Sequence, residues 1–101
     1  MNTITLTGRL TDKPQLTGTD NKPVCRFRIA VDRRDQGADF ITVVTFGPSA
    51  EANATHLTKG RKVAVAGRLH HNEWFDTGDQ RHETYEVIAS NVEWLDGPPA
   101  E

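Results

Sequence analysis

The sequence has a single cysteine and no long apolar run, and these absences exclude secreted disulfide scaffolds and membrane-spanning helices. Cys25 cannot form a disulfide within the chain, which favours a reducing compartment. No apolar stretch approaches the roughly 20 residues that cross a bilayer. The start, Met-Asn-Thr-Ile-Thr, has neither the basic residues nor the apolar run of a signal peptide. We therefore expect a cytoplasmic protein with no membrane association.

Catalytic and metal-binding motifs are also missing from the sequence. It contains no HExxH, CxxC, Walker or GxGxxG pattern and no recognisable Ser-His-Asp arrangement. Histidines occur at positions 56, 70, 71 and 82, but His70 and His71 are adjacent and would face opposite ways on a strand. Surface histidines are the simpler interpretation, so we expect no enzyme activity, no cofactor and no bound metal.

The net charge is only −2, but the two signs are unevenly distributed. Residues 1–71 contain 11 Lys and Arg against 6 Asp and Glu, whereas residues 72–101 contain one arginine against 8 acidic residues. A basic region can attract a polyanion although the whole chain is near neutral. An ordinary solvated surface explains the same counts, so charge alone does not decide between the two.

At 101 residues the chain has the length of one domain, and its hydrophobic pattern predicts strands. The segment from Ser49 to Lys59 instead carries Ala50, Ala54 and Leu57 at helical spacing, and Gly60 is placed to end a short helix. Strands are predicted over 3–10, 24–32, 39–47, 61–69 and 81–95.

Five strands with one helix between the third and fourth is the order of the OB-fold, an all-β five-stranded Greek-key barrel. Gly8 and Gly67 suit strands that bend to close a small barrel. Val87 and Val92 differ in parity, which predicts that the last strand also bends. Cys25 is expected to be a small core residue. We expect the OB-fold domain to span residues 1–96 and residues 97–101 to form a short disordered tail.

The segment Asp39–Gly47 carries two aromatic residues on one face of a predicted strand. Phe40 and Phe46 share one parity, and Ile41 and Val43 share the other, which can enter the core. The two phenylalanines are then about 20 Å apart along the strand. A second core would bury the two rings. Alternatively, the rings would stack with the bases of single-stranded nucleic acid, a ligand with flat groups spaced along a line.

Arginines gather around this aromatic strand. Arg26 and Arg28 share the polar face of the strand 24–32, Arg33 and Arg34 follow at its end, and Arg68 lies near the end of the strand 61–69. Surface arginines are usually only solvated. Their grouping on one predicted hairpin and its neighbour favours contact with phosphates and with it the nucleic-acid interpretation.

Seven short segments, in order along the chain, carry a resemblance to a known family. They are Thr5-Leu-Thr-Gly-Arg-Leu10, Phe27-Arg-Ile-Ala-Val31 before Arg33-Arg34, Val43-Val-Thr-Phe-Gly47, Leu57-Thr-Lys-Gly60, Val63-Ala-Val-Ala-Gly-Arg-Leu69, Trp74 before Asp76, and Tyr85-Glu-Val-Ile-Ala89. Together they resemble the bacterial and phage single-stranded DNA-binding proteins of the OB class, over about residues 3–95. Each segment is weak alone, but their order makes the resemblance specific.

The resemblance implies a non-catalytic protein that binds single-stranded DNA in replication, repair and recombination, close to the nucleoid. It implies that bases stack on Phe40, Phe46 and Trp74 and that arginines line the phosphate path. The family typically forms homotetramers through the first strand and the sheet faces, so we expect a homotetramer, with a dimer as the alternative. The candidate nucleic-acid-binding residues are Phe40, Phe46, Trp74, Arg26, Arg28, Arg33, Arg34, Thr42 and Arg68.

Three features depart from the family pattern. The family's tryptophan after the double arginine is absent, since Arg34 is followed by Asp35-Gln-Gly, which removes one stacking platform. The family's Trp-His-Arg is here Phe40-Ile41-Thr42, which loses a basic contact and bears on the number of subunits. No glycine-rich linker or acidic tail ending in phenylalanine precedes Glu101, so recruitment of partner proteins through a tail is not expected.

Two alternatives stay open beside DNA coating. One is a tail-less OB accessory factor of primosomal type, which binds single strands and a protein partner. The other is an OB interaction module whose aromatic residues form a subunit interface and which binds no nucleic acid. Trp74 lies in a polar run, which favours a binding role, whereas Phe75 is expected to pack and Trp94 to lie in the core or in a subunit contact.

Overall fold

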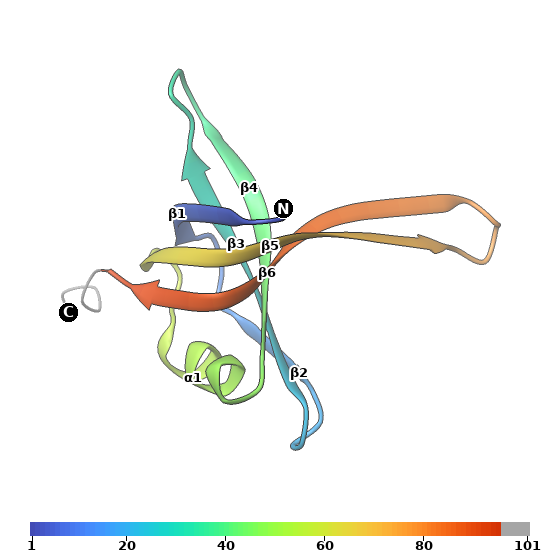
Figure 1. The fold of residues 1–101 in the computed structure, drawn as a ribbon, viewed down its shortest axis with the longest axis horizontal. Coiled ribbons are helices and arrows are strands. Elements are labelled where there is room, and N and C mark those ends of the chain that lie inside the picture. Colours follow the sequence, from blue (N-terminus) through green and yellow to red (C-terminus); the bar gives the residue numbers. More distant parts are fainter. Residues whose placement is uncertain (96–101) are drawn as a thin grey trace.

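Within residues 1–95, six strands form one sheet that closes into a barrel, with a single helix beside it (Figure 1). The computed structural model describes residues 1–95. The elements are β1 (Ile4–Leu10), β2 (Gln15–Gly18), β3 (Pro23–Asp32), β4 (Ala38–Phe46), α1 (Pro48–His56), β5 (Lys62–Phe75) and β6 (Arg81–Trp94). The order in the sheet is β1-β5-β6-β4-β3-β2, and pairing of β1 with β3 closes the ring.

The predicted strands and helix occur in the predicted order, which confirms the all-β OB-fold. The additional element is β2, a four-residue strand in a stretch that the sequence marks as turns. All four of its residues are exposed, so it has no apolar alternation by which to recognise it. It is a strand because it pairs with β3, from Gln15 opposite Arg26 to Gly18 opposite Pro23.

The core fills the inside of the barrel, on the face that the alternation predicts. Cys25, Phe27 and Ile29 of β3 are buried, while Arg26 and Arg28 between them are exposed. Burial raises the pKa of the Cys25 thiol, which keeps it protonated and unreactive, as expected of a small core residue. The other strands contribute Leu10, Val43, Val63, Val65 and Val87 to the same cluster.

Helix α1 ends earlier than predicted. Pro48 occupies its first turn, where a proline leaves no additional hydrogen bond unmade. Leu57 already has extended backbone, yet it is buried against the core together with Ala50. Gly60 has positive φ but lies beyond the helix, in the turn where Arg61 N donates to Thr58 O, so its predicted role in ending the helix was wrong. Within residues 1–95 no helix has the length and apolarity to span a bilayer.

A β-bulge explains why β6 changes parity along its length. Ala66 pairs with Asn91 and Gly67 with Ala89, so Ser90 has no partner in the ladder. Val87 before the bulge and Val92 after it can therefore point to the same side, and the predicted bend is confirmed. Gly67 lies at the bulge because the backbone of β6 passes too close for a side chain.

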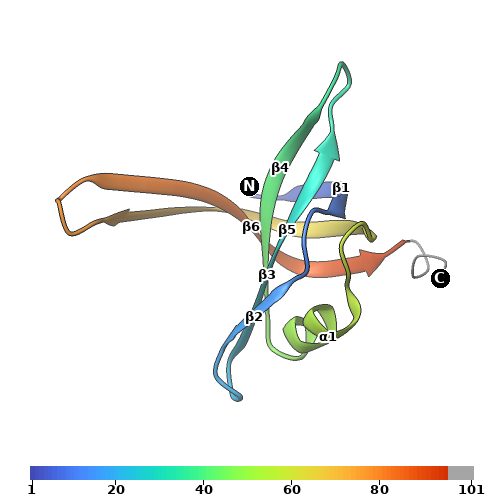
Figure 2. The ribbon, with the colours of Figure 1, turned by 180° about the vertical axis from the view of Figure 1, so that it is seen from behind.

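Beyond the barrel, β5 and β6 continue as a two-stranded arm that stands clear of the other elements in both views (Figures 1 and 2). Beyond the pairs that also contact β4, residues 71–75 pair with residues 81–85 along this arm. A turn joins the two strands of the arm, where Asp79 N donates to Asp76 O at 3.0 Å. Phe75 was expected to pack, but it is exposed because β5 has left the barrel there, and Leu69 at the base of the arm is exposed as well.

Replacing Gly67 with alanine should destabilise the fold. A Cβ at this position would overlap the carbonyl oxygen of Ile88 and lie 2.8 Å from the Cα of Ala89, so the backbone must move. We expect a loss of at least about 2 kcal/mol in the free energy of unfolding, measured by denaturant titration. Gly78→Ala is the matched control, because its nearest atom, Asp76 Oδ1, is 3.5 Å away. Equal stability of the two variants would contradict the close approach at the bulge.

Candidate nucleic-acid interface

Cross-strand pairing brings most of the predicted site residues to one outer face of the sheet. One row of paired residues, from β5 through β6 and β4 to β3, is Arg68, Ile88, Val44 and Arg26. The next row is His70, Glu86, Thr42 and Arg28. Residues paired across neighbouring strands project to the same side of a sheet. The outer face therefore holds seven of the nine predicted residues, namely Arg26, Arg28, Phe40, Thr42, Phe46, Arg68 and Trp74.

Strand β4 presents its aromatic residues at its two ends. Phe40 is 55% exposed and Phe46 is 52% exposed. Val44 shares their face but is only 1% exposed, because it lies between Arg26 of β3 and Ile88 of β6. The two phenylalanine rings are thus exposed separately, one at each end of the strand, with a buried residue between them. Their exposure excludes the second core that the sequence left open.

The arginines divide into two groups. On the outer face, the guanidinium of Arg28 lies 4.6 Å from the centre of the Phe40 ring, a cation–π contact that orients both side chains. Arg33 and Arg34 instead follow β3 in the turn before β4. Arg33 Nε donates to Asp39 Oδ1 at 2.9 Å, which offsets part of its charge. Arg34 is exposed at the same turn, so these two residues extend the interface beyond the face itself.

Trp74 continues the outer face onto the arm. Its indole is 43% exposed and stacks on the imidazole of His82, with ring centres 5.5 Å apart and planes 17° from parallel. His82 Nε2 lies 2.8 Å from Asp76 Oδ2, and the Asp76 side chain also accepts from the turn at Gly78 N. His82 and these turn amides lower the pKa of Asp76. His82, which the sequence marks only as a surface histidine, therefore holds the Trp74 ring in place.

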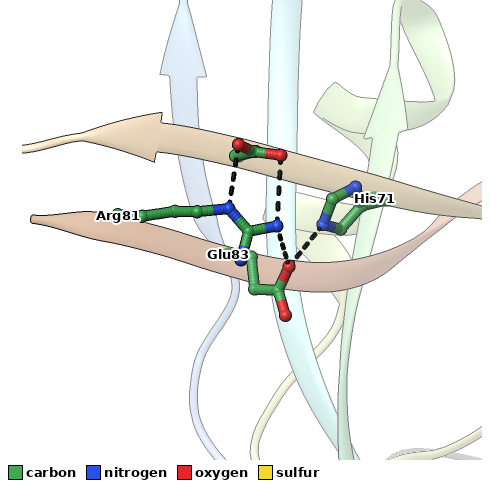
Figure 3. A network of polar contacts seen from close by, with 4 residues as sticks. His71, Arg81 and Glu83 are labelled. Atoms are coloured by element: carbon green, nitrogen blue, oxygen red, sulfur yellow. Dashed lines mark hydrogen bonds and ion pairs between the residues drawn. The ribbon is translucent and has the colours of Figure 1, made fainter.

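The opposite face of the arm carries a network of charged side chains (Figure 3). Arg81 Nε donates to Glu73 Oε1 at 2.9 Å, and its Nη2 donates to Glu83 Oε2 at 2.7 Å. His71 Nε2 lies 2.9 Å from the same Glu83 oxygen. Arg81 lowers the pKa of Glu73, and His71 lowers the pKa of Glu83. The network joins the two strands of the arm, although each exposed pair contributes little alone.

A surface hollow of about 250 Å³ adjoins the arginines of β3. Lys13 and Gln15 line it together with Arg26, Arg28 and Thr42. Gln15 pairs with Arg26, so it extends the first row of the outer face to a fifth strand. No local sequence pattern indicates this extension, because it depends on the pairing of β2 with β3.

A family model described as "Single-strand binding protein family" matches residues 1–95. The chain belongs to this family. It is 42% identical to the single-stranded DNA-binding protein of Fusobacterium nucleatum subsp. nucleatum, over 93% of this chain and 66% of that protein. It is 40% identical to the protein of the same name from Thermotoga maritima, over 99% of this chain and 77% of that protein. The chain thus spans about two thirds to three quarters of the length of these two relatives.

In this member of the single-strand binding protein family, Trp94 lies apart from the outer-face aromatics. It was predicted to lie in the core or in a subunit contact; it is partly exposed and outside the core cluster, which excludes the core, and the subunit contact stays a prediction. Its indole N–H donates to Asn53 Oδ1 at 3.0 Å, which ties the end of β6 to α1. Among residues 1–95, no group of three or more His, Cys, Asp or Glu side chains could hold a metal ion.

Acidification should loosen the arm before it affects the barrel. The pKa values of Glu73, Asp76 and Glu83 are lowered in the folded state from ordinary values of 4.5, 3.8 and 4.5. A lowered folded-state pKa contributes stability that is present above the ordinary value and lost as the pH falls through the folded-state value. Amide exchange protection should therefore fall in residues 71–75 and 81–85 below about pH 4, while that of β3 stays high. Carboxyl NMR should show Asp76 titrating below 3.8 and shifting upward in His82→Ala. An unchanged Asp76 midpoint would refute the role of His82.

Proposed function

We propose that this chain binds single-stranded DNA, without catalysing a reaction, by stacking unpaired bases on Phe40, Phe46 and Trp74. The observation that carries the proposal is the outer face, where exposed rings and arginines lie in register across neighbouring strands. Stacking tolerates any base, because every base has a flat face. The curated relatives are named single-stranded DNA-binding proteins, which supports the same ligand. We expect a role in DNA replication, repair and recombination.

Phosphates would run along the margins of this face. Arg26 and Arg28 lie on β3 at one margin, and Arg68 lies on β5 at the other. Thr42, between them on β4, supplies a hydroxyl that can donate to the sugar–phosphate backbone. Arg33 and Arg34 at the β3–β4 turn extend the basic path. The arginines attract the polyanion although the chain as a whole carries a charge of −2.

The assembly that we expect is a homotetramer in the cytoplasm, close to the nucleoid, with a dimer as the alternative. The replacement Phe40-Ile41-Thr42 makes subunit number the quantity to measure, by light scattering on the intact chain. We place the OB-fold domain at residues 1–96. Residues 97–101, the expected tail, lie outside the described residues, and the proposal gives them no role in recruiting partners.

A protein-binding OB module is the second candidate, because the arm also exposes apolar side chains on its other face. Leu69, Phe75 and Tyr85 are exposed there. Titration with labelled oligo(dT) at two salt concentrations separates the candidates. Binding that weakens with salt supports DNA coating, whereas no binding by a tight oligomer supports the interaction module. An accessory factor would bind both DNA and a separate protein partner.

Alanine at Phe40 or Trp74 should weaken DNA binding while leaving the fold intact. Each ring is about half exposed, so its loss removes a stacking platform and little of the core. We expect a loss of about 1–3 kcal/mol in binding free energy per ring, measured by anisotropy of labelled oligo(dT). The melting temperature should stay nearly constant. Phe75→Ala is the matched control, because Phe75 neighbours Trp74 but lies on the other face of the arm, and it should bind normally. Equal losses in Trp74→Ala and Phe75→Ala would exclude a specific platform.

Replacing the face arginines should reduce the salt dependence of binding. Affinity for single strands falls with log salt at about 0.7 per neutralised phosphate. Arg28→Gln and Arg68→Gln should each lower the slope of log affinity against log salt by about that amount. Lys59→Gln removes the same charge from the exposed turn between α1 and β5, outside the strands that carry the outer face, and should leave the slope unchanged. Three equal slopes would mean that only net charge matters.

A further inference from the structure

Glu86 stands in the middle of the outer face. It pairs with Thr42 of β4 on one side and with His70 of β5 on the other. Its side chain is 14% exposed, so the carboxylate is reached only from the surface above the sheet. A negative group here is unexpected in a face proposed to meet a polyanion, and neither its charge nor its position is used by the stacking mechanism.

Arg26 does not occupy the hydrogen-bonding capacity of this carboxylate. Arg26 Nε lies 3.7 Å from Glu86 Oε2, reaching across β4 from β3. This distance is that of an ion pair and is too long for a hydrogen bond. The guanidinium therefore offsets part of the negative charge, while the carboxylate oxygens stay available as acceptors at the surface.

The surrounding charges decide which part of a nucleotide can approach Glu86. A phosphate directly above it would be repelled, whereas Arg28 and Arg68 at the two margins attract phosphates. Phe40 lies two residues before Thr42, the β4 partner of Glu86, so a base stacked on Phe40 can turn its edge toward Glu86. The groups that meet Glu86 are therefore base edges.

We propose that Glu86 reads these base edges and favours bases that carry an amino group. The inference rests on the proposed function, because it needs bases lying on the outer face. A carboxylate only accepts hydrogen bonds, and the N4 amino group of cytosine donates one, a pairing that acidic side chains make in protein–DNA complexes. Uracil presents a carbonyl oxygen at the same position, which the carboxylate repels. Glu86 thus gives a sequence-tolerant surface a preference for cytosine over uracil.

Oligo(dC) and oligo(dU) of about 12 nucleotides test this directly, because their bases have the same size and differ at the C4–N3 edge. We expect the intact protein to bind oligo(dC) about fivefold more tightly, the low end of what one good base contact provides. In Glu86→Gln the ratio should fall to about one, since an amide can accept from cytosine or donate to uracil. Affinity for both strands should also rise, because a negative charge has been removed.

Glu51→Gln is the matched control, since it removes the same charge from the exposed first turn of α1. Its ratio should stay fivefold. Glu86→Asp withdraws the carboxylate by one methylene and should shrink the ratio, which keeps the test decisive if Glu86→Gln does not fold. Equal binding of the two strands by the unaltered protein overturns the proposal, as does a ratio that persists in both Glu86 variants. Failure of every oligonucleotide, oligo(dT) included, to bind overturns the proposed function instead.

Discussion

The parallel pairing of β4 with β6 is the contact on which the outer face depends. Three residue pairs make it, Thr42 with Glu86, Val43 with Val87 and Val44 with Ile88. This short ladder joins the β3–β4 hairpin, with its arginines and phenylalanines, to the β5–β6 hairpin, with Arg68 and Trp74. A slip of one residue would turn the side chains of one hairpin to the opposite side and separate Phe40 and Phe46 from Arg68 and Trp74.

The centre of this ladder is buried on both sides, which makes the platform rigid. Val43 packs in the barrel core, and Val44 on the other side is covered by its neighbours on β3 and β6. Phe40 and Phe46 lie at the ends of the same strand, where that cover stops. Both rings therefore stay about half exposed, and the Arg28 guanidinium lies over the Phe40 ring. A surface that is ordered before binding loses less conformational entropy when a flexible single strand binds to it.

The interactions that stabilise the arm differ from those that stabilise the barrel. A two-stranded hairpin exposed on both faces is marginal in water. Here it is joined by the ion pairs of Arg81 with Glu73 and Glu83, and by the stack of Trp74 on His82. Exposed pairs of this kind stabilise weakly and depend on salt and pH. Trp74, the third proposed stacking residue, thus lies on a hairpin joined by weak exposed contacts, which suits a segment that adjusts to its ligand.

Much of the fold follows from the sequence, because alternation is local. Cys25, Phe27 and Ile29 inside and Arg26 and Arg28 outside need only the two-residue period of a strand. Short segments in a fixed order resemble single-stranded DNA-binding proteins, and the family match confirms this resemblance. The resemblance predicts the OB-fold and single-stranded DNA as the ligand. That Phe40, Phe46 and Trp74 contact DNA stays a prediction.

Features that depend on contacts between residues distant in the sequence were decided by the tertiary structure alone. Leu69 and Phe75 are exposed because β5 outruns the barrel, and β2 is a strand only because β3 pairs with it. Glu86 reached the centre of the outer face through its pairing with Thr42, 44 residues earlier. Local periodicity states which side of a strand a residue takes, but the neighbour that it meets there is set by long-range register, which no local pattern encodes.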